Sequence, residues 1–183
     1  MSIDIVAHEL IHGVTSATAD LIYFGESGGL NESMPDIFAT AVDFVAASSS
    51  SDVPDYCLGE QVWTPQIPDD ALRYMDDPTL NGRSIDHYSQ YTPGMDVHLS
   101  SGLANNVFYL VSEGGTNSTS KQTVRGIGRH EAEQIVYRAL TVYMTPDTDF
   151  AGARTATVEA ALDLYDPAVA VVVADTWAAC GVE

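Results

Sequence analysis

Positively charged residues are scarce in this sequence of 183 residues. It has 7 lysines and arginines against 26 aspartates and glutamates, which gives a formal net charge of −19. Proteins that bind nucleic acids or anionic membranes need a basic surface, so we expect neither kind of partner. The acidic excess favours cation binding and a strongly solvated surface, although a merely soluble surface accounts for most of these carboxylates.

Long apolar runs are also missing. No stretch of 18 apolar residues predicts a membrane span, and the run from Ala168 to Ala174 is too short for one. No signal peptide is recognisable after Met1. Cysteine is rare as well: Cys57 and Cys180 could form a disulfide if the protein is exported, or remain as buried thiols.

The sequence does contain a metal-binding motif, HELIH, at residues 8–12. In a helix, residues four positions apart lie on one face, so His8 and His12 can direct two imidazoles to a single point. Imidazole suits zinc, and catalytic zinc sites commonly take three protein ligands and a water. Glu9 follows the first histidine, where its carboxylate can take a proton from that water. Because so short a pattern also arises by chance, the surrounding sequence has to supply the third ligand.

The third zinc ligand is expected at Glu32, with nineteen residues between it and His12. Asp36 lies four residues further on, on the same helical face, and can accept a hydrogen bond from the ring of a zinc-bound histidine. The related pattern HExxHxxGxxH is excluded, because Thr15 and Thr18 occupy its glycine and third-histidine positions. The alternative for Glu32 and Asp36 is a pair of solvated charges at a helix start.

With these residues the sequence resembles the thermolysin-like zinc metallopeptidases. The motifs that carry the resemblance are HELIHGVT at 8–15, LIY at 21–23, ESGGLNE at 26–32, ALR at 71–73, DHYS at 86–89, VHLSSG at 97–102 and GIGR at 126–129. They cover only the C-terminal half of such an enzyme. The resemblance implies a secreted zinc endopeptidase that acts on peptides or proteins. It also favours a disulfide between Cys57 and Cys180, because the family is exported to oxidising surroundings.

Apolar periodicity predicts a single, mainly helical bundle over residues 1–183, similar to the C-terminal domain of that family and without a convincing sheet. The first helix is expected over residues 3–17, followed by a glycine-rich loop over 20–29. Asn31 is expected to cap the next helix, with Pro35 in its first turn. Later helices are predicted over residues 99–113, 129–144, 150–164 and 167–179. Polar or irregular loops are predicted over 46–55 and 57–96, the longer one with short helices and organised by bound ions.

The resemblance also implies structural calcium, which binds six to eight oxygens and often carboxylates that converge from loops. One calcium site of the family corresponds to Asp4, Asp43, Asp55 and Glu60. Cys57 replaces a further carboxylate there, and because a thiol suits calcium poorly, this site is expected to be weakened or reduced to one ion. A second, largely backbone-built site corresponds to Trp63, Thr64, Ile67 and Asp70. The alternative is a group of loop acids without an ion.

Several catalytic positions follow from the same resemblance. The family's two donors to the tetrahedral oxyanion correspond to His98 and Tyr23. Its arginine that holds the peptide carbonyl corresponds to Arg73, a fixed fork of donors. Asp96 is the nearby residue that can orient His98. The family prefers a bulky apolar residue after the cut, in a pocket that corresponds to Ile5, Leu58 and Leu72. A lone tyrosine or arginine is otherwise explained by packing or a surface ion pair, and His87 and His130 are expected to be structural or exposed.

Two functions remain open at this point. The first is a zinc metalloendopeptidase with Glu9 as general base. The second is a catalytically incompetent, metal-binding remnant or interaction module. Family members carry a strand-rich domain before this point, so the chain is expected to be part of a longer precursor and to expose one flank of helix 3–17. A different metallohydrolase, such as a gluzincin aminopeptidase, fits the spacing before Glu32 less well.

Overall fold

The computed structural model of the chain describes residues 2–47, 53–68 and 70–183. Within them, six α-helices form most of the structure, which confirms the mainly helical fold. They are α1 (Ile3–Ala17), α2 (Gly25–Ala47), α3 (Val97–Glu113), α4 (Arg129–Arg138), α5 (Phe150–Leu164) and α6 (Pro167–Ala179). Residues 48–52 of the predicted polar loop over 46–55 lie outside the described residues.

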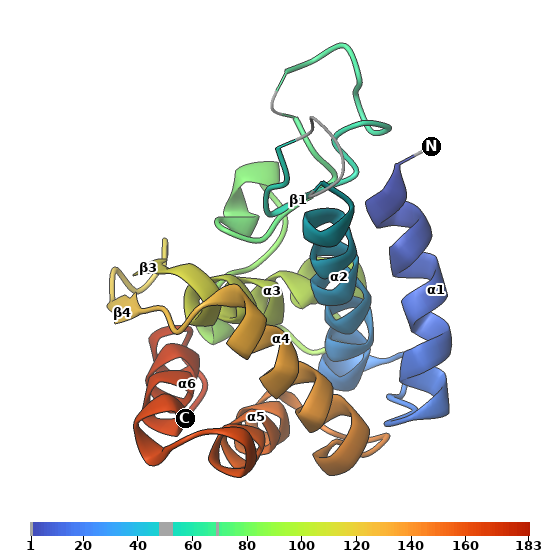
Figure 1. Cartoon of the computed structure of the whole chain (residues 1–183). Helices are drawn as coiled ribbons and strands as arrows, with labels where there is room; N and C mark the ends of the chain where they lie inside the picture. Colours follow the sequence, from blue (N-terminus) through green and yellow to red (C-terminus); the bar gives the residue numbers. More distant parts are fainter. Residues whose placement is uncertain (1, 48–52, 69) are drawn as a thin grey trace.

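Helix α2 is the centre of the arrangement. Helix α1 packs along one side of it and α3 along another. Helices α4 and α6 pack against α3, and α5 packs against both α4 and α6 (Figure 1). The irregular segment after α2, teal to green in Figure 1, lies at the opposite end of the molecule from the C-terminus. Large side chains fill the space between the helices without solvent contact, among them Leu30, Ile37, Leu103, Phe108, Leu110, Ile135, Leu140 and Phe150.

Helix α1 buries polar residues and exposes apolar ones. Asp4, His8 and Thr15 are buried, whereas Val6 and Leu10 are 40% and 70% exposed. The buried residues recur at intervals of four and seven, so they share one helical face. The exposed apolar flank expected from the sequence is therefore present, and the polar face directs the histidines of the HELIH motif toward α2.

Helix α2 begins at Gly25, six residues before the expected cap at Asn31. The prediction of a loop over residues 20–29 is therefore wrong for residues 25–29, which are helical. Gly28 and Gly29 lie inside the helix because α3 passes very close to them. A Cβ atom at Gly28 would lie 2.5 Å from Val97 Cγ1, and one at Gly29 would lie 2.6 Å from Ser100 Oγ. These glycines therefore allow two helices to pack closely, instead of reversing the chain. Pro35 lies well inside α2 and not in its first turn, where it removes one backbone donor.

Aspartates begin three of the later helices. Asp96 accepts a hydrogen bond from the backbone of His98 at 3.0 Å, so α3 starts two residues before its predicted start. Asp149 and Asp166 cap α5 and α6 in the same way, and both helices have the predicted bounds. The helix predicted over 129–144 is divided: α4 ends at Arg138 and a π-helical turn, η3 (Ala139–Tyr143), follows it.

Two short antiparallel hairpins correct the expectation that no sheet is present. Strand β1 (Cys57–Leu58) pairs with β2 (Arg73–Tyr74), and β3 (Gly114–Thr116) pairs with β4 (Thr123–Arg125). Strands of two or three residues are too short to show an alternating pattern in the sequence. The first hairpin matters for the site, because pairing Leu58 with Arg73 holds the arginine against α2. Two short 3₁₀-helices also occur in this segment, η1 (Pro78–Asn81) and η2 (Tyr88–Gln90), as expected.

The two cysteines are free thiols, so the disulfide favoured by the family resemblance is wrong. Cys57 lies in the β1–β2 hairpin, whereas Cys180 follows α6 and is buried beside Asn117. Burial raises the pKa of each thiol to about 12, and neighbouring carboxylates add to the effect at both. Both sulfurs therefore remain protonated and unreactive at neutral pH.

Candidate metal centre

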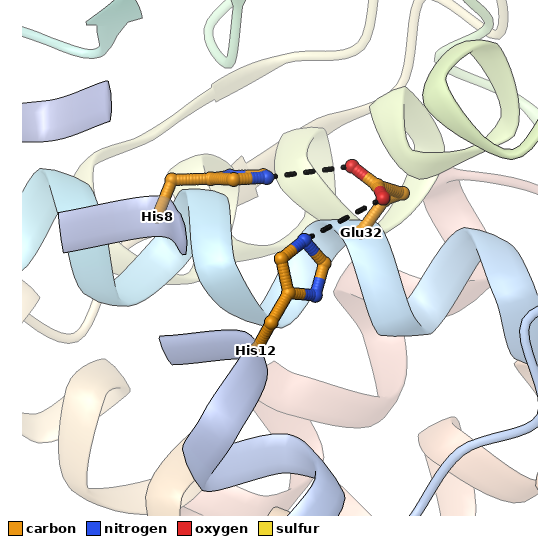
Figure 2. A group of neighbouring side chains, drawn as sticks. All are labelled: His8, His12 and Glu32. Carbon is orange, nitrogen blue, oxygen red and sulfur yellow. Dashed lines mark ion pairs between the residues drawn. The ribbon is translucent and has the colours of Figure 1, made fainter. Parts of the chain in front are cut away.

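Two histidines and a glutamate converge between α1 and α2 (Figure 2). His8 and His12 come from successive turns of α1, with their rings edge to face and their centroids 4.8 Å apart. Glu32 comes from α2: its Oε2 lies 3.5 Å from His8 Nε2, and its Oε1 lies 3.6 Å from His12 Nε2. One ligand atom from each residue can be chosen so that all three lie within 4.8 Å of one another. The three proposed zinc ligands are therefore brought together.

The second ring nitrogen of each histidine is held by an oxygen from α2. His8 Nδ1 lies 2.8 Å from Asp36 Oδ1, and His12 Nδ1 lies 3.1 Å from Asn31 Oδ1. These contacts fix the rings so that both Nε2 atoms face Glu32, as the outer partners of metal-binding histidines do. Asp36 is where the sequence placed it. Asn31 was expected to cap a helix, and no local signal in the sequence links it to His12.

Asp36 is fully buried and, besides its contact with His8, accepts hydrogen bonds from two other side chains. Arg73 donates to it twice, from Nε and Nη2, each at 2.7 Å, and Asn105 donates at 2.8 Å. Burial opposes ionisation of this carboxyl, but the Arg73 guanidinium and the bond to His8 prevail and lower its pKa to about 2. Arg73 was expected to hold a peptide carbonyl. Two of its nitrogens bond to Asp36, so Arg73 also supports His8 through this shared carboxylate.

Glu32 carries the feature that most favours a bound cation. Its side chain is 2% exposed, and Oε2 has no hydrogen-bond partner. Burial alone would raise the pKa of this carboxyl, yet contacts with His8, Tyr23 and His98 lower it. A buried, ionised oxygen without a donor is costly unless a positive charge lies beside it. Two imidazole nitrogens and one carboxylate oxygen are a zinc ligand set, so the residues present fit this metal.

His8 is affected by the same negative surroundings. Burial alone would lower its pKa, but the contacts with the Asp36 and Glu32 carboxylates raise it to about 9. The position between α1 and α2 therefore favours positive charge strongly.

Tyr23 and His98 border the same glutamate on its open side. The Tyr23 hydroxyl donates to Glu32 Oε1 and lies 3.3 Å from His98 Nε2. Burial and the bond to Glu32 raise the pKa of Tyr23, so its hydroxyl remains a donor. His98 Nε2 lies 3.6 Å from Glu32 Oε2, and its Nδ1 lies 2.9 Å from Asp96 Oδ1. The two expected oxyanion donors and the expected orienting aspartate are therefore adjacent to the three candidate ligands.

Glu9 occupies the position after His8 on α1 and is exposed. It makes no hydrogen bond or ion pair with any residue that the structure describes. Successive helical residues are rotated by about 100° around the axis, so Glu9 lies beside the histidine face and not within it. A side chain in this position is accessible to water and substrate without being a ligand itself.

Residues 19–182 match the family described as "Thermolysin metallopeptidase, alpha-helical domain". The chain belongs to this family. The match confirms the resemblance seen in the motifs, although the whole of α1 precedes the matched residues. The predicted membership of the thermolysin-like family and the mainly helical fold are thus both confirmed.

Curated relatives of the thermolysin family match nearly the whole chain. "Thermolysin" from Alicyclobacillus acidocaldarius subsp. acidocaldarius is 48% identical over 167 residues, which are 89% of this chain and 29% of that protein. The "Transglutaminase-activating metalloprotease" of Streptomyces mobaraensis is 48% identical over 177 residues, 90% of this chain and 23% of that protein. The chain thus spans less than a third of the length of either relative.

A solved structure also supports membership of the thermolysin family. The precursor of protealysin, a metalloproteinase from Serratia proteamaculans, superposes with a TM-score of 0.81 at 32% sequence identity. The match covers 100% of this chain, α1 included, and 58% of the protealysin chain. The fold of the thermolysin family therefore extends over the helix that carries the HELIH motif.

An open groove of about 500 Å³ lies beside the candidate metal centre, and His98 and Asp96 are among the residues that line it. Leu72 and Arg73, which the resemblance assigns to substrate binding, also line it, together with Trp63 and Leu80. Leu58, which was expected to contribute to a substrate pocket, lies in the core with no exposed surface. Of these two leucines, only Leu72 therefore contributes to the surface of the groove.

The acids expected to bind calcium lie in two groups. Burial raises the pKa of Glu60, and the negative charges of Asp4, Asp55 and Asp43 raise it further. Glu60 Oε2 is buried without a hydrogen-bond partner, whereas Asp4 Oδ2 accepts from the backbone of Gly59 at 2.6 Å. Within the described residues, these acids do not bring three ligand atoms together as tightly as the histidine site does.

The second acidic group is better satisfied. Thr64 donates to one oxygen of Asp70 at 2.5 Å, and the Tyr74 hydroxyl donates to the other at 3.1 Å. Trp63 and Ile67, from the same segment, are exposed. Because both Asp70 oxygens already have donors, this segment needs an ion less than Glu60 does.

The remaining histidines are structural or exposed, as expected. His87 caps η2 and accepts a hydrogen bond from the backbone of Ser89, while His130 lies on α4 with its ring exposed. In the part of the chain that the structure describes, no helix has both the length and the apolar character needed to cross a bilayer.

Proposed function

We propose that this chain forms the metal-binding helical part of a zinc endopeptidase, with His8, His12 and Glu32 as zinc ligands. The observation that carries the proposal is the buried Oε2 of Glu32, which lacks a hydrogen-bond donor and faces imidazole nitrogens. Membership of the thermolysin family supports the same metal and the same reaction class. Zinc, when bound, supplies Lewis acidity: it polarises a carbonyl and acidifies a water.

The surrounding residues have separate tasks in peptide hydrolysis. Glu9 accepts a proton from the attacking water and returns it to the leaving nitrogen. Tyr23 and His98 donate hydrogen bonds to the carbonyl oxygen as negative charge develops on it, with Asp96 holding the His98 ring in place. Leu72 lines the adjacent groove, which supports a preference for a bulky apolar residue after the cut.

Zinc content and peptide cleavage test this proposal together. We expect one equivalent of zinc and zinc-dependent cleavage of an internally quenched peptide, faster with leucine than with glycine after the cut. Glu32→Gln should weaken zinc binding by more than about 100-fold, because it removes a ligand and not only an outer partner. Glu159→Gln on the exposed side of α5 serves as the control. One equivalent of zinc without cleavage would favour the alternative, a non-catalytic metal-binding module, and absence of zinc binding would contradict both.

We also propose that Asp4, Asp43, Asp55 and Glu60 hold calcium, with the unpartnered Glu60 Oε2 as the supporting observation. The Cys57 thiol beside them is a poor calcium ligand, so we propose a single ion.

Thermal melts with and without calcium test that site. A ligand at 100 times its Kd stabilises a protein by about 2.7 kcal/mol, so calcium should raise the Tm of the native protein. Glu60→Gln should raise the Tm without calcium, because it relieves repulsion among the acids, and should abolish the calcium response. Asp70→Asn should leave that response in place. A calcium response unchanged by Glu60→Gln would contradict the assignment.

A further inference from the structure

The groove beside the metal centre contains one cation whose charge is not balanced. Arg73 is paired with Asp36, and the two other arginines with ion pairs, Arg129 and Arg138, bind Glu133 and Asp163. Arg83 lines the groove, is exposed, and has no ion pair with any described residue. In a chain of net charge −19, a free guanidinium beside a candidate active site is unexpected.

The acids that share the groove are already engaged. Asp96 accepts hydrogen bonds from the ring and the backbone of His98, at 2.9 and 3.0 Å. Asp70 accepts from Thr64 and Tyr74. The pKa of Asp96 is lowered mainly by those bonds from His98, and Arg83 makes a smaller contribution, so the two charges influence each other without forming a pair. A carboxylate that entered the groove would therefore find Arg83 available.

The backbone at Arg83 is fixed at the rim of the groove. Helix η1 ends at Asn81, whose side-chain oxygen accepts from the backbone nitrogens of Arg83 and Ser84 at 3.0 and 2.8 Å. Gly82 between them has φ +74°, a left-handed conformation that ends the helix at little cost for glycine. The side chain thus extends from a defined point and not from a loosely held loop.

We propose that Arg83 is a specificity-determining residue that pairs with a substrate carboxylate on the C-terminal side of the cut bond. This inference rests on the proposed endopeptidase function. The C-terminal side follows from Leu72, which lies in the same groove and is assigned to the residue after the cut. The carboxylate belongs either to an acidic side chain or to a free C-terminus, because both present the same two oxygens.

A carboxylate suits Arg83 better than a neutral group does. The planar guanidinium presents parallel donors that match both oxygens of a carboxylate, and such charge-assisted pairs are stronger than neutral hydrogen bonds. The acidic protein as a whole repels an anionic peptide, but at physiological salt this repulsion is screened beyond about 8 Å. The contact with Arg83 therefore determines the preference for a carboxylate over a neutral group. For a solvent-accessible ion pair we expect this preference to be about fivefold.

The test uses amidated, internally quenched peptides with leucine as the first residue after the cut. The second residue after the cut is glutamate, glutamine or lysine, and the peptides are otherwise identical. A further pair of peptides, the second pair, ends at this glutamine. One member of the pair has a free C-terminal carboxylate and the other a C-terminal amide. Cleavage is measured as kcat/KM for the zinc-loaded protein. Equilibrium binding of the same peptides is measured by fluorescence anisotropy in the Glu9→Gln variant. The variants compared are Arg83→Gln, Arg83→Glu and the control Arg125→Gln. The control removes the same charge from β4, at a position that does not line the groove.

With Arg83 present, glutamate should be preferred over glutamine about fivefold in both Kd and kcat/KM. Arg83→Gln should remove the preference, Arg83→Glu should transfer it to lysine, and Arg125→Gln should retain it. A preference confined to the second pair assigns the carboxylate to the substrate's C-terminus. Equal binding of the charged and neutral peptides in both sets, or a preference that survives Arg83→Gln, overturns the inference. Cleavage without discrimination leaves the endopeptidase function standing, whereas discrimination in binding without cleavage removes that function and keeps the role of Arg83.

Discussion

Glu9→Gln is expected to lower kcat/KM for peptide cleavage by about 10²–10⁴-fold, while one equivalent of zinc remains bound. Glutamine has almost the same size as glutamate but cannot take a proton from water. Glu9 is exposed and has no hydrogen bond or ion pair with a described residue, so the substitution should leave the fold unchanged. The expected loss therefore measures the proton transfer alone.

Zinc content, thermal stability and kcat/KM should be measured on the same preparations. Glu159→Gln, with the same chemical change on exposed α5, should match the native protein in all three. If the Glu9→Gln variant keeps its zinc and cleaves within tenfold of the native rate, Glu9 is not the general base. A loss of zinc in this variant would show instead that Glu9 contributes to metal binding.

Asp36→Ala should lower the free energy of unfolding by about 3–5 kcal/mol in zinc-free protein. It leaves the buried guanidinium of Arg73 without its counterion, and it deprives His8 Nδ1 and Asn105 Nδ2 of their common acceptor. The His8 ring loses its orientation as well, so zinc affinity should fall by about 10–100-fold. Both losses have one cause, because a single carboxylate supports the arginine and the histidine.

Denaturant unfolding without zinc separates the two losses, and a competition assay with a chelator gives the zinc affinity. Asp163→Ala breaks the exposed pair with Arg138 and should change stability far less. The double variant Asp36→Ala with Arg73→Met should recover part of the stability, since it no longer buries an uncompensated charge. Equal effects of Asp36→Ala and Asp163→Ala would show that the buried pair is not important for stability.

Local signals explain which helices could be predicted from the sequence. Helices α5 and α6 have their expected bounds, because an aspartate caps each one and Pro167 fits the first turn of α6. The pairing of His8 with His12 could also be predicted from local sequence, because a helix alone brings together two side chains four residues apart. Glu32 was proposed from its position nineteen residues beyond His12 and from Asp36 four residues further on, because no helical periodicity links it to α1.

Features that depend on tertiary contacts could not be predicted. Arg73 and Asn105 reach Asp36 across 37 and 69 residues of sequence, and no periodicity indicates such a meeting. The start of α2 was misplaced because Gly28 and Gly29 have low helix propensity, which their packing against α3 overrides. The prediction of a disulfide was wrong because secretion of a protein family does not determine which cysteines lie close together in one of its members.

The two glycines of α2 have a consequence for the metal centre itself. Gly28 precedes Glu32 by four positions, on the same face, and α2 lies between α1 and α3 without slack. A methyl group at either glycine would wedge the helices apart and carry the Glu32 carboxylate with them. The alignment of Glu32, the proposed zinc ligand, thus depends on the absence of side chains one helical turn away.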